Sequence, residues 1–504
     1  MELNEELELF RDNVQRFIER EIAPHYEQWE RDEIFPRDVW NKLGEQGLLC
    51  VDLPEEYGSA GAAFTFSTVI LEEFSRANFG ALGGPMTVHS DIVAHYLLNH
   101  GSEQQKRKYL PGFVSGDCVG AVAMTEPGAG SDLQGVRTQA RQEADEWVLN
   151  GSKTFITNGQ HCDLVVVVAR TNMAVSGAKG TSLFLVERDT PGFSRGRNLE
   201  KIGLHASDTS ELFFEDVRLP GSALLGELDR GFAVLMNELP RERLVLAVGA
   251  VAAAEGVLAE TVDYCKQREA FGAPIAALQN TRFKLADLAT KVRVNRSFVD
   301  ECTRLYLRGE LDAATVSMAK LASTEMQGEV ADGCLQLYGG YGFMREYGVS
   351  RAFVDARVQR IYGGTSEIMK LLIYRMGMRS MAADLKPPIR VIDEELGVPM
   401  PIGKLQSKAA VSGEDDILKV LAENYRVNPG LHMTMADFKE LLDITDDDLN
   451  KYLLSLEEKD LVGLYRDKKG RLAMARVNYK GLAQANPPEY YKYMPQWVGL
   501  EDMF

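Results

Sequence analysis

Residues 124–132 read Met124-Thr125-Glu126-Pro127-Gly128-Ala129-Gly130-Ser131-Asp132, a dense cluster of turn-forming and small polar residues. Glycine and proline at this density predict a tight turn that exposes backbone N–H groups and small hydroxyls. Such a turn suits close approach to a polar ring edge or a phosphate, although a plain surface turn is the commoner meaning of a glycine-rich loop. The stretch also marks a change in the pattern of the chain, because helical periodicity precedes it and short β-branched runs follow it.

The segment before this turn has a helical pattern. Apolar residues recur at spacings of three and four near the N-terminus, at Leu7, Phe10, Val14 and Phe17. Similar stripes return further along the segment, which is the signature of amphipathic helices. We therefore expect an all-α segment from Leu3 to about residue 110.

The segment after the turn has the pattern of strands. Short runs rich in β-branched residues occupy 164–168, 182–186 and 211–214, and Gly, Asn, Asp and Pro separate them. Runs of this length between turn residues predict strands. We expect a small antiparallel β-domain between residues 119 and about 225.

Helical periodicity resumes after Gly231. Four long Ala- and Leu-rich segments, at 243–267, 281–308, 313–336 and 368–381, predict a helical bundle. Prolines and glycines between 383 and 412 then interrupt regular structure, which indicates a linker.

A separate unit of about 90 residues follows this linker. Helices are expected at 415–424, 435–442 and 446–458, followed by two short strand-like runs around a charged turn at 466–470. Three helices followed by a hairpin resemble a winged-helix module. The expected domains are an N-terminal α-helical domain at 1–118, a middle β-domain at 119–226, a C-terminal α-helical bundle at 227–382, a linker at 383–412 and a winged-helix-like extension at 413–504.

Bulk composition narrows the class of protein. The 504 residues exceed what one core supports, and the formal net charge of −18 disfavours nonspecific attraction to nucleic acid or an anionic membrane. The longest apolar run, 244–254, is short and Ala-rich, and the N-terminus lacks the order of a signal peptide. The six cysteines are scattered without metal-ligand spacing. We expect a cytoplasmic protein with reduced thiols, no bound metal and no membrane or nucleic-acid partner.

Five ordered motifs resemble the signatures of the acyl-CoA dehydrogenase family. The first is the stretch at 124–132, and the others follow in the family's order. They are Lys153-Thr154-Phe155-Ile156-Thr157-Asn158-Gly159, Arg268-Glu269-Ala270-Phe271-Gly272 with Gln279, Gln336-Leu337-Tyr338-Gly339-Gly340-Tyr341-Gly342, and Asp355-Ala356-Arg357 leading to Ile361-Tyr362-Gly363-Gly364-Thr365-Ser366-Glu367.

The resemblance implies a fold and a cofactor. The fold is mainly α with a central β-domain: an N-terminal α-domain, a β-barrel-like middle domain and a C-terminal four-helix bundle. The cofactor is FAD, held in a homo-oligomer, with a tetramer expected, because the family completes each cofactor site across a subunit boundary. The residues that the resemblance assigns to the flavin are Met124, Thr125, Gly130, Ser131, Phe155, Thr157, Thr365 and Glu367, and those that it assigns to the adenine and pyrophosphate are Arg268, Phe271, Gln279, Gln336, Gly339 and Gly340.

The resemblance also implies a general base, because removing the α-proton of a thioester needs a carboxylate within reach. Many members carry it in a Tyr-Glu-Gly-Thr motif, which reads Tyr362-Gly363-Gly364-Thr365 here. Long-chain and isovaleryl-type members carry it in a Glu-Arg pair, which Glu242-Arg243 matches. We expect Glu242 to be the base and Glu238 to be a weaker competitor, since Pro240 predicts a helix start between them.

The implied reaction is α,β-dehydrogenation of an acyl-CoA to a trans-2-enoyl-CoA. Glu242 takes the α-proton, a hydride leaves Cβ for flavin N5, and a backbone N–H at Gly363 polarises the thioester carbonyl. Ser131, Arg243 and Tyr362 are expected to contact the substrate. Medium-to-long straight acyl chains are favoured, and the expected electron acceptor is electron-transferring flavoprotein.

Two other functions fit part of the sequence. An acyl-CoA oxidase shares the fold but passes electrons to oxygen, and such oxidases are commonly longer by a second helical bundle. A regulatory or nucleic-acid-binding flavoprotein would use the C-terminal winged-helix-like domain. The acidic residues of its helix at 446–458 would repel phosphates, which disfavours this second alternative. The hairpin is basic, which leaves nucleic-acid contact through the wing alone open, but a role in protein docking or in capping the oligomer is favoured for this domain.

Overall fold

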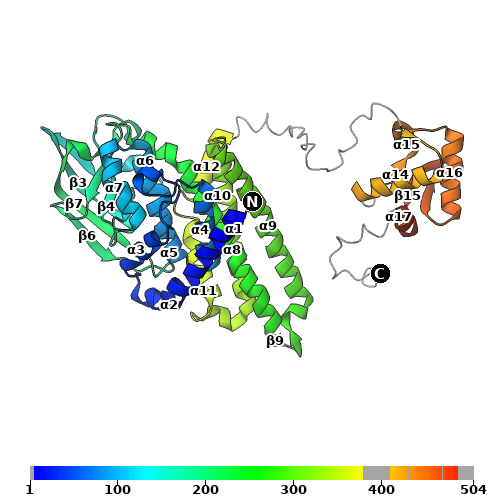
Figure 1. The fold of residues 1–504 in the computed structure, drawn as a ribbon, viewed down its shortest axis with the longest axis horizontal. Helices are drawn as coiled ribbons and strands as arrows, with labels where there is room; N and C mark the ends of the chain where they lie inside the picture. The colour runs from blue at the N-terminus through cyan, green and yellow to red at the C-terminus, as the bar shows by residue number, and fades with distance from the viewer. Residues whose placement is uncertain (1–4, 378–408, 428–431, 468, 486–504) are drawn as a thin grey trace. The chain divides into compact units, whose positions relative to one another are not determined.

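The structure is a computed structural model that describes residues 5–377, 409–427, 432–467 and 469–485. The chain divides into two compact units, Met1–Lys386 and Pro387–Phe504. Figure 1 shows the order of the elements along the chain. The first unit contains every candidate site residue and consists of two helical parts with a β-domain between them in the sequence.

The first part is all-helical and packs around one apolar cluster that includes Phe17, Trp40 and Phe74. Its last helix begins with a capping box, in which Ser102 and Gln105 satisfy each other's backbone N–H groups, and it ends at Gly116, where φ is +80°. Its elements are α1 (Glu5–Phe17), η1 (Ile18–Ile22), α2 (Ala23–Asp32), α3 (Asp38–Glu45), η2 (Glu55–Tyr57), α4 (Phe64–Arg76), α5 (Gly80–Thr87), η3 (Val88–Val93), α6 (Ala94–His100) and α7 (Glu103–Ser115).

An eight-stranded sheet forms the β-domain, with the order β6-β7-β3-β2-β4-β5-β8 and with β1 paired to β4. The prediction of an antiparallel domain is wrong at β4, which pairs in parallel with β1 and, at one position, with β2. The connection between β1 and β4 passes through the β2–β3 hairpin, a crossover long enough for parallel pairing. The strands are β1 (Gly120–Ala123), β2 (Gln139–Glu143), β3 (Glu146–Thr157), β4 (Leu164–Arg170), β5 (Thr181–Glu187), β6 (Phe193–Asn198), β7 (Thr209–Pro220) and β8 (Leu224–Leu225).

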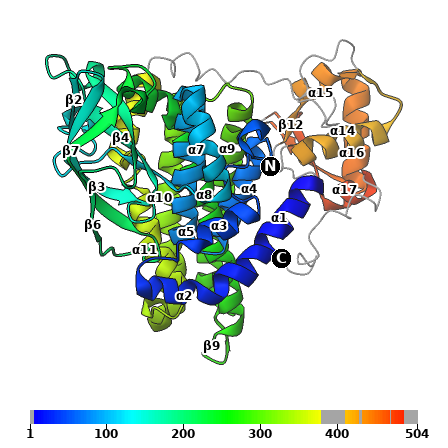
Figure 2. The same cartoon turned by 60° about the vertical axis from the view of Figure 1, so that its left-hand side comes forward.

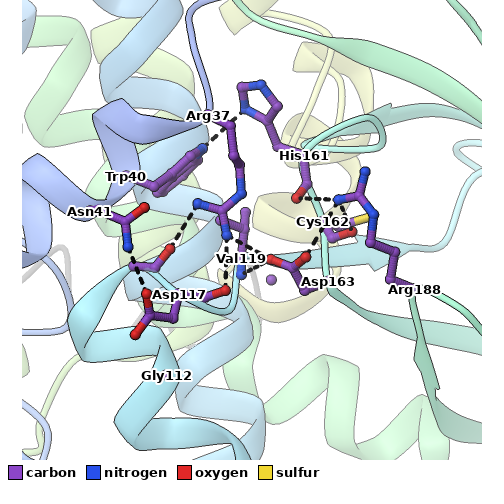
Figure 3. A network of polar contacts seen from close by, with 12 residues as sticks. Arg37, Trp40, Asn41, Gly112, Asp117, Val119, His161, Cys162, Asp163 and Arg188 are labelled. Atoms are coloured by element: carbon purple, nitrogen blue, oxygen red, sulfur yellow. Dashed lines mark hydrogen bonds and ion pairs between the residues drawn. The ribbon is translucent and has the colours of Figure 1, made fainter.

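A polar network fastens the β-domain to the helices that precede it (Figure 3). Arg37 donates to the Gly116 carbonyl at 2.8 Å and pairs with Asp163, just before β4, at 2.8 Å. Trp40 Nε1 donates to His161 Nδ1 at 3.0 Å. Burial lowers the pKa of His161, so the neutral ring can accept this bond. The network therefore fixes the sheet relative to α3 and α7.

The second helical part follows the sheet, and α8 lies at its centre (Figure 2). Among the described helices, α8 alone has the length and apolar composition that would let it cross a membrane. It packs instead in the interior against α4 and α10, as a core helix does. The elements are α8 (Gly231–Gln267), a small hairpin of β9 (Glu269–Ala270) and β10 (Ala273–Pro274), η7 (Ile275–Ala277), α9 (Gln279–Leu307), α10 (Ala313–Tyr338), η8 (Gly339–Phe343), α11 (Gly348–Gln359), α12 (Ser366–Leu372) and η9 (Ile373–Gly377).

The prediction that Pro240 starts a helix is wrong. α8 begins at Gly231 and runs through Pro240 without a break. Proline cannot donate to the carbonyl four residues earlier, which belongs to Met236. Met236 is 40% exposed, so the turn that loses this bond lies on a flank that solvent reaches. Glu238 and Glu242 consequently lie one turn apart on the same helix.

The second unit has the three helices and the hairpin that the sequence predicts. The hairpin strands pair in antiparallel register, and a short strand before the second helix completes a three-stranded sheet in the order β12-β15-β14. Its core includes Ile417, Phe438 and Leu453. The elements are β11 (Ala409–Ala410), α14 (Glu414–Val427), β12 (Met433–Thr434), α15 (Met435–Leu441), β13 (Leu442–Asp443), α16 (Asp446–Glu458), β14 (Val462–Arg466), β15 (Leu472–Val477) and α17 (Tyr479–Ala485).

Candidate active site

Glu242 lies near the N-terminal end of α8 and is only 6% exposed. The hydroxyl of Tyr96, on α6, donates to Glu242 Oε1 at 2.5 Å. The pKa of Glu242 is raised to about 7, mainly by burial; Glu238 adds to the rise, while the Tyr96 bond and the charge of Arg243 oppose it. A carboxylate whose pKa lies near neutrality can exchange a proton at physiological pH, which is what a general base requires.

Glu238 faces the same helix, α6, but its carboxylate is engaged by other side chains. Asn99 Nδ2 donates to both carboxylate oxygens, at 3.0 and 3.2 Å. His100 Nε2 lies 2.8 Å from Oε1. Two polar partners therefore hold Glu238, whereas one hydroxyl contacts Glu242.

The two arginines beside Glu242 point to other elements. Arg241 forms buried ion pairs with Asp52 at 2.8 Å and with Asp91 at 2.7 Å. Arg243 donates to the hydroxyl of Ser317, on α10, at 3.3 Å, and its buried Nε has no hydrogen-bond partner among the described residues. Arg243 therefore faces the bundle interior, and its charge acts on Glu242 from there.

Gly363 lies beside the turn of α8 that follows Glu242. A Cβ built on Gly363 would meet Leu246 Cδ1 at 2.4 Å, and Leu246 is one turn beyond Glu242. The φ angles of Gly363 and Gly364 are +63° and +97°, a region that favours glycine. The buried Lys320 donates to the Gly364 carbonyl at 2.8 Å and so fixes this loop on α10.

Lys320 is a second buried cation, besides Arg243, beside the loop that contains Gly363. Burial and, to a smaller extent, the nearby charge of Arg243 together lower the pKa of Lys320 to about 8. Tyr362, which precedes the two glycines, is half-buried. The structure thus brings together Glu242, Arg243 and the loop that contains Gly363, although 121 residues separate Glu242 from Gly363 in the sequence.

The loop at 124–132 is attached to β3 by a buried ion pair. Lys153 Nζ lies 2.8 Å from Glu126 Oε1 and donates to the Met124 carbonyl at 3.1 Å. Thr154 N also donates to the Thr125 carbonyl at 2.9 Å. These bonds place Met124 and Thr125 beside the part of β3 that carries Phe155 and Thr157.

The side chains assigned to the flavin on this face remain partly open. Phe155 has φ +59° and is 68% exposed, while Thr157 is half-buried. Gly130 and Ser131 are exposed, and no described protein atom lies within 4 Å of a Cβ built on Gly130. A planar ring with polar edges fits a face that offers an exposed aromatic ring and threonine hydroxyls.

A cavity of about 500 Å³ gathers four of the six residues assigned to the adenine and pyrophosphate. It is lined by Arg268, Gln336, Gly339 and Gly340. The guanidinium of Arg268 and the amide of Gln336 supply donors for an anion. No described atom lies within 4 Å of a Cβ built on either glycine, so a ligand can approach the backbone closely. The donor set and the open backbone fit a dinucleotide.

The remaining assigned residues lie in separate places. Phe271, in the β9–β10 hairpin, has φ +55° and is 95% exposed. Gln279 is the first residue of α9. Thr365 caps α12 by accepting the N–H of Ile368, and Glu367 is exposed in the first turn of that helix.

Three contacts of the site could not be predicted from patterns in the sequence. Tyr96 lies in an ordinary apolar helix, and 146 residues separate it from Glu242. Lys320 is a single lysine in a long helix, and only its burial shows that it holds the loop. Glu126 and Lys153 both stand in quoted motifs, but their ion pair depends on the docking of a loop on a strand.

Three family models match consecutive parts of the first unit. They are the N-terminal domain of acyl-CoA dehydrogenases at residues 4–117, the middle domain at 121–217 and the C-terminal domain at 229–378. The chain is 52% identical over 371 residues to the mitochondrial long-chain specific acyl-CoA dehydrogenase of Sus scrofa, covering 73% of this chain and 86% of that protein.

Solved structures agree with these matches. An acyl-CoA dehydrogenase from Geobacillus kaustophilus has a TM-score of 0.73 at 47% identity, covering 74% of this chain and 98% of that one. A glutaryl-CoA dehydrogenase from Mycobacterium smegmatis in complex with FADH2 has a TM-score of 0.70 at 30% identity, covering 77% of this chain and 97% of that one. The fold class predicted from the sequence is confirmed, and the chain belongs to the acyl-CoA dehydrogenase family of flavin-dependent oxidoreductases.

Proposed function

We propose that the protein oxidises the Cα–Cβ bond of an acyl-CoA to a trans-2-enoyl-CoA, with Glu242 as the general base and FAD as the cofactor. The observation that supports this role is the environment of Glu242. It is a buried carboxylate with a pKa of about 7, one helical turn from the residue that touches the Gly363 loop. The chemistry supplied by FAD, when bound, is acceptance of the hydride that leaves Cβ.

Glu242 removes the α-proton in its ionised form. Because its pKa is raised to about 7, the fraction of active base increases as the pH rises through neutrality. The same raised pKa makes the carboxylate a stronger base than an exposed glutamate. The turnover rate should therefore have an acid limb near neutral pH.

The loop at 362–365 supplies the polarising donor. A thioester α-proton is too weakly acidic for a carboxylate unless the carbonyl oxygen is hydrogen-bonded, since enolate charge develops there. Gly363 lacks a side chain but keeps its backbone N–H, and Lys320 holds the next carbonyl in place. Arg243 and Lys320 add positive charge beside the loop, which favours developing negative charge.

Two surfaces of the chain hold the cofactor in this proposal. The 124–132 loop and β3 would contact the flavin ring, and the cavity of Arg268 and Gln336 would hold the phosphates and adenine. The exposed Phe271 lies at the tip of a hairpin, where an apolar side chain needs a covering partner. We infer that a second copy of the chain covers it and that the cofactor site is completed in a homo-oligomer, with a tetramer expected from the family.

A long acyl chain is the proposed substrate class, and electron-transferring flavoprotein is the proposed electron acceptor. The placement of the base on α8 and the similarity to a long-chain specific relative support the substrate. A panel of acyl-CoA substrates from four to eighteen carbons, assayed with an artificial electron acceptor, measures the preference directly. A maximum at short branched substrates would contradict this assignment.

An oxidase is the alternative within the same chemistry. Its signature is stoichiometric hydrogen peroxide when substrate is turned over under air without another acceptor. The proposed dehydrogenase should form little peroxide and should transfer electrons to added electron-transferring flavoprotein.

The decisive test compares two glutamates on successive turns of the same helix. Glu242→Gln keeps size and hydrogen bonding but removes the base, so anaerobic reduction of the flavin by substrate should slow by about two to four orders of magnitude. Glu238→Gln is the matched control, since Asn99 can still hydrogen-bond the amide, and it should have a much smaller effect. The proposal fails if the two effects are reversed or if Glu242→Gln reduces its flavin at the unmodified rate.

A further inference from the structure

We propose that Tyr96 is a positioning residue for the base: its hydroxyl holds Oε1 of Glu242, so that Oε2 is the oxygen that takes the α-proton. This inference rests on the proposed function of Glu242 and adds to it a residue from a different domain. The contact joins α6 of the N-terminal helical part to α8, and the two residues are 146 positions apart.

The geometry of α6 supports a specific role. Tyr96, Asn99 and His100 are spaced i, i+3 and i+4, so they lie on one face of the helix. This face meets two successive acidic turns of α8, with Tyr96 on Glu242 and the other two on Glu238. Each carboxylate therefore has its own partners, and the short 2.5 Å bond belongs to the proposed base.

Burial makes this bond consequential. Tyr96 is fully buried, and an ionised carboxylate has no proton to give, so the Tyr96 hydroxyl is the donor of this bond. Burial raises the pKa of Tyr96 well above its usual value, and the neighbouring Glu242 raises it further, so the phenol keeps its proton. A single donated bond fixes one carboxylate oxygen and leaves the lone pairs of the other directed elsewhere.

The bond also opposes the effect of burial on the base. The charged and titratable groups that face Glu242 are Tyr96 from α6, and Arg243 and Glu238 from its own helix. Burial and Glu238 favour the protonated form of Glu242, whereas Tyr96 and Arg243 favour the ionised form. Without Tyr96, the carboxylate should stay protonated to a higher pH and lose its fixed orientation.

The experiment measures the pH dependence of flavin reduction in Tyr96→Phe. The matched control is Tyr109→Phe, because Tyr109 on α7 also donates to a carboxylate, Glu187 at 2.7 Å, outside the site. The FAD-loaded proteins are mixed anaerobically with palmitoyl-CoA between pH 5.5 and 9.5, and flavin bleaching is followed in a single turnover. The FAD content of each variant shows whether it is folded.

The acid limb of Tyr96→Phe should move to higher pH by about one unit. A hydrogen bond stabilises the ionised form of a carboxylate by an energy that corresponds to roughly one pKa unit, and this variant loses that bond. The rate should then fall at least tenfold at pH 6 and by a smaller factor at pH 9, where the remaining loss reports the lost orientation of the carboxylate. Tyr109→Phe should follow the unmodified protein throughout.

Two outcomes would overturn the inference while leaving the base in place. These are an unchanged limb in Tyr96→Phe, or a loss of rate that is equal at every pH, which is the sign of a purely structural role. Glu242→Gln, measured in the same series, separates these outcomes from failure of the proposed function. Unimpaired flavin reduction in that variant would show that Glu242 is not the base, and Tyr96 would then have no base to position.

Discussion

Moving the carboxylate from Glu242 to position 363 would test whether the two positions face the same substrate carbon. Gly363→Glu places an L-residue at φ +63°, which costs about 1–2 kcal/mol. The new Cβ would also meet Leu246 Cδ1 at 2.4 Å, and the displaced leucine rotamer costs about 0.5–1.5 kcal/mol. The substitution should therefore destabilise the first unit by about 1.5–3.5 kcal/mol.

Leu246→Ala removes the clash with the leucine side chain but leaves the backbone strain at φ +63°. In a double-mutant cycle, the penalty of Gly363→Glu should be smaller by about 1 kcal/mol when Leu246 is alanine. Leu258→Ala, further along α8, is the control and should leave the penalty unchanged. Thermal unfolding midpoints of the FAD-loaded variants measure the coupling.

Activity gives the second readout of the same cycle. Glu242→Gly with Gly363→Glu should regain part of the flavin reduction rate that Glu242→Gly loses, and adding Leu246→Ala should raise it further. The regain should stay partial, because the contact that orients the native carboxylate, from Tyr96, is made at position 242 on α8 and not at the loop. Zero coupling between positions 246 and 363 would refute the placement of the loop, and no regain with FAD bound would refute the shared substrate carbon.

The remaining predictions concern the cofactor face, the oligomer and the second unit. Lys153→Met leaves the Glu126 carboxylate buried without its cation, so the free energy of unfolding should fall by about 3–5 kcal/mol, and adding Glu126→Gln should recover part of it in chemical denaturation. Phe271→Asp should lower the mass measured by light scattering and release FAD, and an unchanged mass would contradict the inferred contact between copies. Deletion of 413–504 should leave FAD content and turnover within about twofold, because the deleted residues carry none of the cofactor motifs; a sharp loss would show that the second unit supports the site.

The sequence predicts elements well where one physical signal dominates. β4 is a continuous apolar run between turn residues, and it is a fully buried strand. α10 follows Asp312, whose side chain caps it, and its Ala-rich pattern continues to the glycines at 339–340. Local chemistry is sufficient in both cases, so their type and approximate bounds follow from the residues alone.

Prediction fails where the outcome depends on distant partners. The parallel pairing of β1 with β4 depends on where the β2–β3 hairpin crosses, which no local pattern encodes. Pro240 has the sequence character of a helix start, but the packing of α8 outweighs the one lost hydrogen bond. Tyr96 could not be identified as a neighbour of Glu242, because the docking of α6 on α8 brings them together.

The four buried polar residues near the start of α8 affect the register in which this helix packs in the bundle. From Leu244 to Leu258 the helix is almost uniformly small and apolar, so sliding or rotating by a turn would bury similar surface. Glu238, Arg241, Glu242 and Arg243 instead each contact a different set of partners, from α6, from Asp52 and Asp91, and from α10. Buried polar groups of this kind contribute little net stability but penalise every wrong register. The same side chains that line the candidate site should therefore also fix the register of α8, because a helix shifted by one turn would bury these charges without their partners and would misfold.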